Sequence, residues 1–150
     1  MNREIILPHN IEAENAVIGA MLISDEAISH AVIYLEKDDF YRKDTATIFE
    51  AMRIMNLHRE AVDLVTVSEY LVKNNLMEDA GGPVNVNRLL NAVPTAANVA
   101  YYVKIVKEKA ELRNLINAAT KIASAAYEDT DSVENIMAEA AKSLLAVATR

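Results

Sequence analysis

Apolar residues recur at steps of three and four along most of this 150-residue chain, which is the period of an α-helix. The first predicted helix covers Ile11–Ile23, because Asn10 is a favourable N-cap and acids occupy the next turn. A second covers residues 25–35 after the cap Ser24, and a third covers residues 44–57. The chain is therefore expected to be all-α.

The polar residues of the first helix, Glu12 and Asn15, align with Gly19 on one narrow edge. Such an edge belongs either to a core helix with one solvated side or to a docking strip on which glycine permits close approach. After the second helix an acidic stretch ends in Phe40 and Tyr41, which we expect to anchor the loop in the core.

The middle of the chain carries the clearest local signals for helix starts. Thr66 and Glu69 have the spacing of a capping box, which predicts a helix that begins at Thr66 and ends near Asn74. The Gly81-Gly82 turn precedes Pro83, and proline favours the first position of a short helix.

Residues 95–127 contain no proline or glycine and predict one long helix of about 45 Å. Its first half carries one apolar stripe and its second half carries another on a shifted phase, so we expect the second half to project from the body. The first stripe comprises Val99, Val103, Val106 and Ala110, and the second comprises Leu112, Leu115, Ala119, Ile122 and Ala126.

A final helix follows a polar turn, with Asp131 as its expected cap and Glu134 as the box partner. A seam of heptad-like spacing runs along it, formed by Val133, Ile136 or Met137, Ala140, Leu144 and Val147. Two such helices joined by a short turn predict an antiparallel hairpin. The expected architecture is a small helical head over residues 1–94, with a loose arm at 1–9, followed by a long helical hairpin over residues 95–150.

Apolar residues beyond the seam suggest that a second copy of the chain completes the hairpin, although they could instead cover its base. The candidate residues for this self-association are Leu115, Ile116, Ala119, Ile122, Ile136, Ala140, Leu144 and Leu145.

Composition offers little support for catalysis. The chain has no cysteine, and its three histidines share no metal-ligand spacing with each other or with carboxylates. Its three glycines do not form a phosphate loop. We therefore expect no catalytic residue, no cofactor and no metal in this segment.

Charge and hydropathy suggest the compartment and the class of partner. Residues 1–94 carry the whole net charge of −7, and residues 95–150 are balanced. An acidic surface is poorly suited to phosphate backbones, so strong direct DNA binding is not expected. No apolar run has the length of a membrane span, and the N-terminus lacks the apolar region of a signal peptide, so a cytoplasmic chain without membrane contact is expected.

Four motifs occur in a fixed order along the chain. They are LPHNIEAE at residues 7–14 with AVIGA at 16–20, DFYR at 39–42, VDLVTV at 62–67, and VPTAAN at 93–98 followed by YY and KIV. Together they resemble the N-terminal domain of the bacterial replicative DNA helicase of the DnaB type, and the resemblance covers essentially the whole chain.

That resemblance implies a collar domain without chemistry of its own. In the family, copies form homodimers and three such dimers build the collar of a ring-shaped hexamer. The collar receives the C-terminal helicase-binding domain of primase and, in some members, a helicase loader. ATP and Mg²⁺ belong to a separate RecA-like motor for 5′–3′ unwinding, expected beyond Arg150, and the expected location is the nucleoid and replisome.

The resemblance also supplies candidate primase-contact or modulating residues. Glu12, Asp79, Arg113 and Ile116 match positions with that role in the family. Asn85 stands where relatives often have an aromatic residue, which is a departure from the pattern.

A free-standing nucleic-acid-binding module, or a helicase-interaction module of the primase type, is the alternative. Lys104, Lys107 and Lys109 cluster on the long helix, but Glu108 and Glu111 offset them, which is typical of a solvated helix face.

Overall fold

The computed structural model describes residues 5–149, and all regular structure in that range is helical. Seven α-helices and one short 3-10 helix follow one another without a strand among the described residues, which confirms the expected all-α class. The chain separates into two compact units, each considered by itself below: residues 9–110 form the head, and residues 5–8 with 111–149 form the hairpin unit. The boundary falls inside α6, whereas the sequence pattern places it at residue 94.

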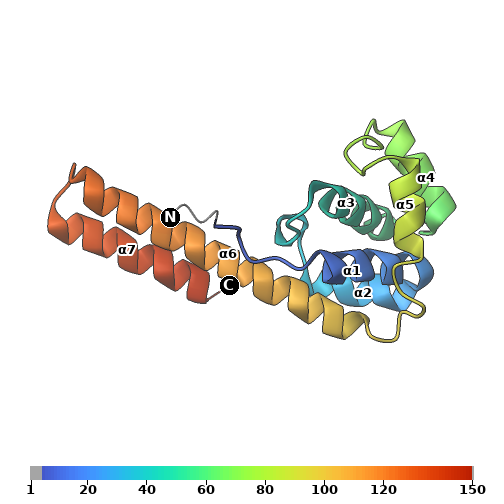
Figure 1. Cartoon of the computed structure of the whole chain (residues 1–150), viewed down its shortest axis with the longest axis horizontal. Helices are drawn as coiled ribbons and strands as arrows, with labels where there is room; N and C mark the ends of the chain where they lie inside the picture. The colour runs from blue at the N-terminus through green and yellow to red at the C-terminus, as the bar shows by residue number, and fades with distance from the viewer. Residues whose placement is uncertain (1–4, 150) are drawn as a thin grey trace. The chain divides into compact units, whose positions relative to one another are not determined.

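The head begins with three α-helices, whose ends follow the predicted caps closely. They are α1 (Ile11–Ile23), α2 (Asp25–Tyr34) and α3 (Lys43–Leu57), and the 3-10 helix η1 (Lys37–Asp39) lies between the last two. The Oδ1 atom of Asn10 accepts a hydrogen bond from the Ala13 amide at 2.9 Å. Ser24 ends α1 and caps α2 through its hydroxyl, so one residue sets the bend between two packed helices (Figure 1).

Two shorter helices complete this part of the head, α4 (Leu64–Lys73) and α5 (Pro83–Leu90). The predicted N-cap of α4, Thr66, is wrong by three residues. Asp63 is the N-cap, its carboxylate accepts from the Thr66 amide, and the Thr66 hydroxyl accepts from the Asp63 amide, each at 2.9 Å. Thr66 therefore belongs to a capping box as its third helical residue, not as its first member.

The core of the head lies between α1, α3 and the first part of α6 (Val99–Glu128). Val17, Ile18 and Met21 are fully buried, and the rings of Phe40 and Phe49 pack with their centroids 4.8 Å apart. The prediction that Tyr41 is also a core anchor is wrong, because the residue is 42% exposed and its ring stacks on His9.

Gly19 resolves the question about the edge of α1. A Cβ at this position would lie 2.6 Å from the carbonyl oxygen of Leu89, so the end of α5 occupies the space that the missing side chain leaves. Gly19 is buried, and the close approach it permits is made within the head.

The hairpin unit consists of the second part of α6 and α7 (Val133–Ala148), which runs back beside it (Figure 1). The predicted cap Asp131 is wrong by one residue. Ser132 is the N-cap and its hydroxyl accepts from the Asn135 amide, while the Asp131 carboxylate accepts from the Asn135 side chain at 2.9 Å. Asp129 has a positive φ of 50°, which turns the chain directly after α6.

Candidate interaction surface

The described residues hold no constellation of the kind that binds metal. Within residues 5–149 no three His, Cys, Asp or Glu side chains gather closely enough for an ion. None of the helices described is both long and apolar enough to cross a membrane. The features that remain to be explained are surfaces, and the hairpin exposes several large apolar side chains.

The two hairpin helices face each other through small and half-buried side chains. Ala118 is buried and Ile122 half-buried on α6, and Ile136 and Ala140 are half-buried on α7. The predicted seam on α7 is therefore correct for Ala140 and Val147, and Ile136 takes the position for which Met137 was the alternative. The seam is wrong for Val133 and Leu144, which are exposed.

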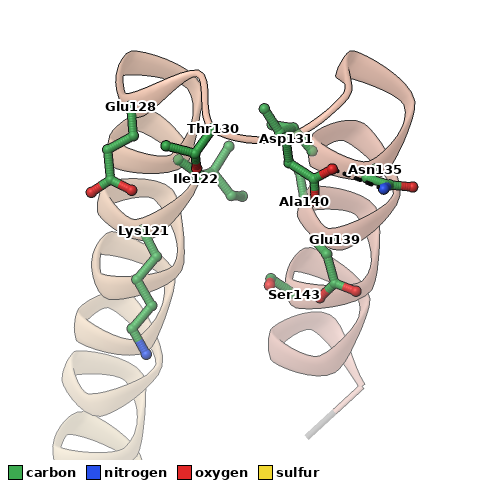
Figure 2. Close-up of a pocket in the computed structure, with 11 residues that line it drawn as sticks. Lys121, Ile122, Glu128, Thr130, Asp131, Asn135, Glu139, Ala140 and Ser143 are labelled. Carbon is green, nitrogen blue, oxygen red and sulfur yellow. Dashed lines mark hydrogen bonds between the residues drawn. The ribbon is translucent and has the colours of Figure 1, made fainter.

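A groove of about 290 Å³ remains between the helices near the turn (Figure 2). Ala125, Ala140 and Ser143 line it with short side chains, so the helices leave space there. Charged groups border it, with Lys121 and Glu128 on α6 and Glu139 on α7.

The larger apolar side chains of the hairpin lie outside this seam. On α6, Leu115 is 45% exposed and belongs to a stripe with Leu112 and Ala119. On α7, Leu144 is 44% exposed and shares a stripe with Val133 and Met137. An isolated hairpin therefore leaves two apolar stripes in water.

Helical geometry places both stripes on one side of the hairpin. At about 100° per residue, the α6 stripe is rotated by roughly 110° from the residues that face α7, and the α7 stripe by roughly 70° from those that face α6. On each helix the stripe is reached from the facing residues by turning in the direction in which the chain winds. Because the two helices are antiparallel, these two turns bring both stripes to the same side of the hairpin. We call this surface the hairpin face; it comprises Leu112, Leu115, Ala119, Val133, Met137 and Leu144.

The candidate self-association residues divide according to this geometry. Leu115, Ala119 and Leu144 belong to the hairpin face, whereas Ile122, Ile136 and Ala140 line the groove between the two helices. Ile116 and Leu145 are exposed but point away from the sister helix, since each lies roughly 180° from the seam of its own helix.

The candidate partner-contact residues of the head do not all meet. Asp79 pairs with Lys43 at 3.1 Å, and the side-chain amide of Asn85 donates to the Asp44 carboxylate at 3.0 Å. These two candidates, Asp79 and Asn85, therefore lie together at the start of α3. Glu12 is exposed in the first turn of α1, and no contact joins it to them.

Asn85 holds α5 against α3, a role that its sequence context did not indicate. Its Nδ2 atom also donates to the Ala80 carbonyl at 2.7 Å, and its Oδ1 atom accepts from Arg88 at 2.6 Å. Gly81 has a φ of +90°, and a Cβ there would lie 2.4 Å from that same Nδ2 atom. The glycine turn and the polar Asn85 side chain are therefore complementary parts of one local structure.

Asp44 is the ionised centre of this network. Burial alone would raise the pKa of Asp44, but hydrogen bonds from Arg42, from the Thr45 amide and from Asn85, together with the charge of Arg42, hold that pKa below its ordinary value. Arg42 donates from Nε at 3.0 Å, and its own pKa is raised by the same hydrogen bond.

Glu14 is a structurally important residue that the sequence pattern marked only as an acid in the first turn of α1. It is 1% exposed and accepts from the Tyr41 amide at 2.9 Å, the Arg42 amide at 3.2 Å and the Thr45 hydroxyl at 2.7 Å. Its carboxylate thus caps α3 from another helix. The available signal was its position one turn before Ile18, on the buried side of α1.

Arg113 and Ile116 lie in the hairpin unit, one turn apart on α6. Arg113 is only 7% exposed, and its Nη1 atom donates to the Pro8 carbonyl oxygen at 2.9 Å. Arg113 therefore holds the N-terminal arm, a contact between residues 105 positions apart that the sequence could not reveal.

Comparison with known proteins gives a consistent result. Residues 6–108 match the family model described as DnaB-like helicase N terminal domain. The chain is 46% identical over 143 residues to the replicative DNA helicase DnaC of Bacillus subtilis and 42% identical over 147 residues to the replicative DNA helicase DnaB of Geobacillus stearothermophilus. These alignments cover 95% and 98% of this chain but 32% of each relative, so the chain spans about a third of their length.

Solved structures show the same fold. The N-terminal domain of DnaB helicase from Mycobacterium tuberculosis superposes with a TM-score of 0.88 at 33% identity and covers 93% of this chain and 99% of that one. A DnaB-like replicative helicase, described with its interactions with primase, superposes with a TM-score of 0.76 at 20% identity, over 92% of this chain and 31% of the other.

Proposed function

The chain belongs to the family of DnaB-like helicase N-terminal domains, and from that premise we propose that it is a collar domain that assembles copies of a replicative helicase and docks primase. The observation that carries the assembly role is the hairpin face, which is apolar and exposed in the single chain. Covering it with the same face of a second copy would remove both stripes from water. A homodimer built in this way is the proposed unit of a ring, as a trimer of dimers.

Unwinding itself is proposed for a motor domain outside these residues. Its ATP and Mg²⁺ sites and its 5′–3′ translocation would lie in the part of the relatives that this chain does not span. The chain would act in the cytoplasm at the nucleoid, and in some settings a helicase loader would use the same collar.

Self-association is tested with a matched pair of adjacent leucines. Leu144→Ser removes a residue of the hairpin face, and Leu145→Ser removes its neighbour on the outer side of α7. We expect Leu144→Ser to weaken the dimer by about tenfold or more in sedimentation-equilibrium experiments, since a buried leucine contributes about 1.5–3 kcal/mol. Leu145→Ser should change the dimer dissociation constant by less than about threefold.

A wild-type chain that stays monomeric at a concentration of hundreds of micromolar would contradict the assembly role. Equal loss of affinity in both serine variants would contradict the hairpin face as its location.

Primase docking is supported by the description of the similar DnaB-like helicase and is proposed to involve Glu12, Asp79, Asn85 and Ile116. Arg113, which is only 7% exposed, is proposed to modulate docking without touching primase. Glu12 offers the cleanest test, because it is exposed and no contact holds it. Its matched control is Glu26, which is also exposed and is also the second residue of its helix.

Calorimetric titration with the C-terminal helicase-binding domain of primase is the measurement. We expect Glu12→Lys to weaken binding by about tenfold, as for loss of one charged contact, and Glu26→Lys to leave it unchanged. Equal affinities for both variants would remove Glu12 from the proposed contact.

Direct binding of nucleic acid gains no support from the lysines of α6. Lys107 pairs with the nearly buried carboxylate of Asp39 at 3.2 Å, and Lys104 lies 4.0 Å from Glu108. These partners reduce the positive potential that phosphate binding would need.

A further inference from the structure

We propose that the N-terminal arm, residues 5–8, is part of the surface that a second copy covers, and that Arg113 positions it there. This inference rests on the proposed self-association and adds a third element to the two helices of the hairpin. It also gives Arg113 a positioning role in place of a direct contact with primase.

The arm is apolar and its far end is uncovered. It reads Ile-Ile-Leu-Pro and belongs to the same compact unit as the hairpin. Ile5 is 89% exposed and Ile6 is 64% exposed, whereas Leu7 and Pro8 are half-buried. Two consecutive isoleucines in water are an unfavourable arrangement that a partner surface would relieve.

Arg113 fixes the place where the arm meets α6. A buried guanidinium requires acceptors, and the Pro8 carbonyl oxygen supplies one at 2.9 Å. We call this hydrogen bond between Arg113 and Pro8 the clasp. Because proline restricts the backbone, the clasp holds the arm at a conformationally stiff residue.

The arm borders the hairpin face through Ile116. Around α6, the Leu112 side chain, the Ile116 side chain and the Arg113 clasp follow one another at intervals of roughly 40–60°. Ile116 is 37% exposed, so apolar surface continues from the hairpin face around α6 to the arm. The Arg113 contact lies about 100° around α6 from Leu112, so a second copy would have to wrap around α6 to cover the arm as well as the hairpin face.

The test compares Ile5→Ser/Ile6→Ser with Val65→Ser/Val84→Ser in the full chain. The control valines are 73% and 83% exposed on α4 and α5, so both double variants remove two exposed aliphatic side chains. Neither should shift the monomer Tm by more than about 2 °C. We expect the arm variant to weaken the dimer by about tenfold in sedimentation equilibrium, and the control variant to leave it unchanged.

Arg113→Ala tests the positioning role through non-additivity. Alone it should weaken the dimer to a similar degree as the arm variant, and combined with Ile5→Ser/Ile6→Ser it should add less than about threefold. A large additional loss in the combined variant would overturn the positioning role, because Arg113 would then act independently of the arm.

The outcomes for the arm and for the hairpin separate cleanly. If the arm variant behaves like its control while Leu144→Ser weakens the dimer, the arm proposal is overturned and the collar function stands. If Leu144→Ser also leaves the dimer intact, the hairpin face is not where the copies meet, and the arm proposal fails with it. A monomeric wild type would overturn the proposed assembly role itself.

Discussion

Helices α1 and α7 are of similar length and both rich in apolar residues, yet nine of the thirteen residues of α1 are buried and none of the sixteen residues of α7 is. The head finds partners for its apolar side chains within the chain, from α1, α3, α5 and the first part of α6. The hairpin offers each helix only one neighbour. Apolar content alone therefore does not say where a surface is buried; the number of neighbouring elements does.

The largest expected difference between the two regions comes from truncating one large side chain in each. Phe49 is fully buried in the head, and Phe49→Ala should lower the free energy of unfolding by about 3–5 kcal/mol. Leu144→Ala in the hairpin should change it by less than about 1 kcal/mol at concentrations where the chain is monomeric. Urea denaturation followed by circular dichroism measures both, and similar costs would break the comparison.

An intermediate effect is expected where the head buries a charge. Glu14→Gln keeps the shape of the side chain but replaces a carboxylate that accepts three hydrogen bonds, and it should cost about 1–3 kcal/mol of unfolding free energy. Glu128→Gln, at the exposed end of α6, should cost less than about 0.5 kcal/mol. If both cost the same, the three hydrogen bonds contribute little.

The smallest effect is expected from acid, and it compares two aspartates. The pKa of Asp44 in the head and that of Asp131 in the hairpin turn are both lowered, the latter by hydrogen bonds from the Asn135 side chain and the Ser132 amide. A lowered pKa means that the unfolded chain binds the proton more readily, so the stabilisation is present at neutral pH and is lost as the pH falls below about 4.

Because Asp44 is nearly buried and Asp131 is fully exposed, only Asp44 should influence unfolding appreciably. Asp44→Asn should cost about 1–2 kcal/mol at pH 7 and flatten the loss of stability between about pH 5 and pH 2, whereas Asp131→Asn should leave the pH profile unchanged. Thermal unfolding across that range is the measurement. An unaltered profile in Asp44→Asn would show that other carboxylates dominate the acid response.

Local chemistry predicts most of the helices but not their partners. Asn10, Ser24 and Pro83 mark helix starts because capping acts within one turn, and all three lie where expected. The start of α4 was misplaced because Asp63 and Thr66 satisfy the same capping pattern as Thr66 and Glu69. The local sequence alone does not show which of these two overlapping capping boxes begins the helix.

The hairpin seam shows the second kind of limit. Leu144 and Ile136 are equally apolar, and only the partner helix decides which of them turns inward. Arg113 shows a third limit of prediction from sequence. An arginine between apolar residues can be buried or exposed, and here its burial depends on the contact with Pro8. In both cases the outcome depends on contacts between residues that are distant in sequence.

The carboxylate of Glu14 sets a limit on how far the chain can be shortened from its beginning. The amide of Arg42, the N-cap residue of α3, donates to this acceptor 28 positions upstream. A fragment that starts after α1 would leave the amides of Tyr41 and Arg42 without that acceptor and would fray at the point where Phe40 enters the core. Removal of residues 1–8 would leave the hydrogen bonds to Glu14 in place, so deletions of the arm can be studied on an intact head.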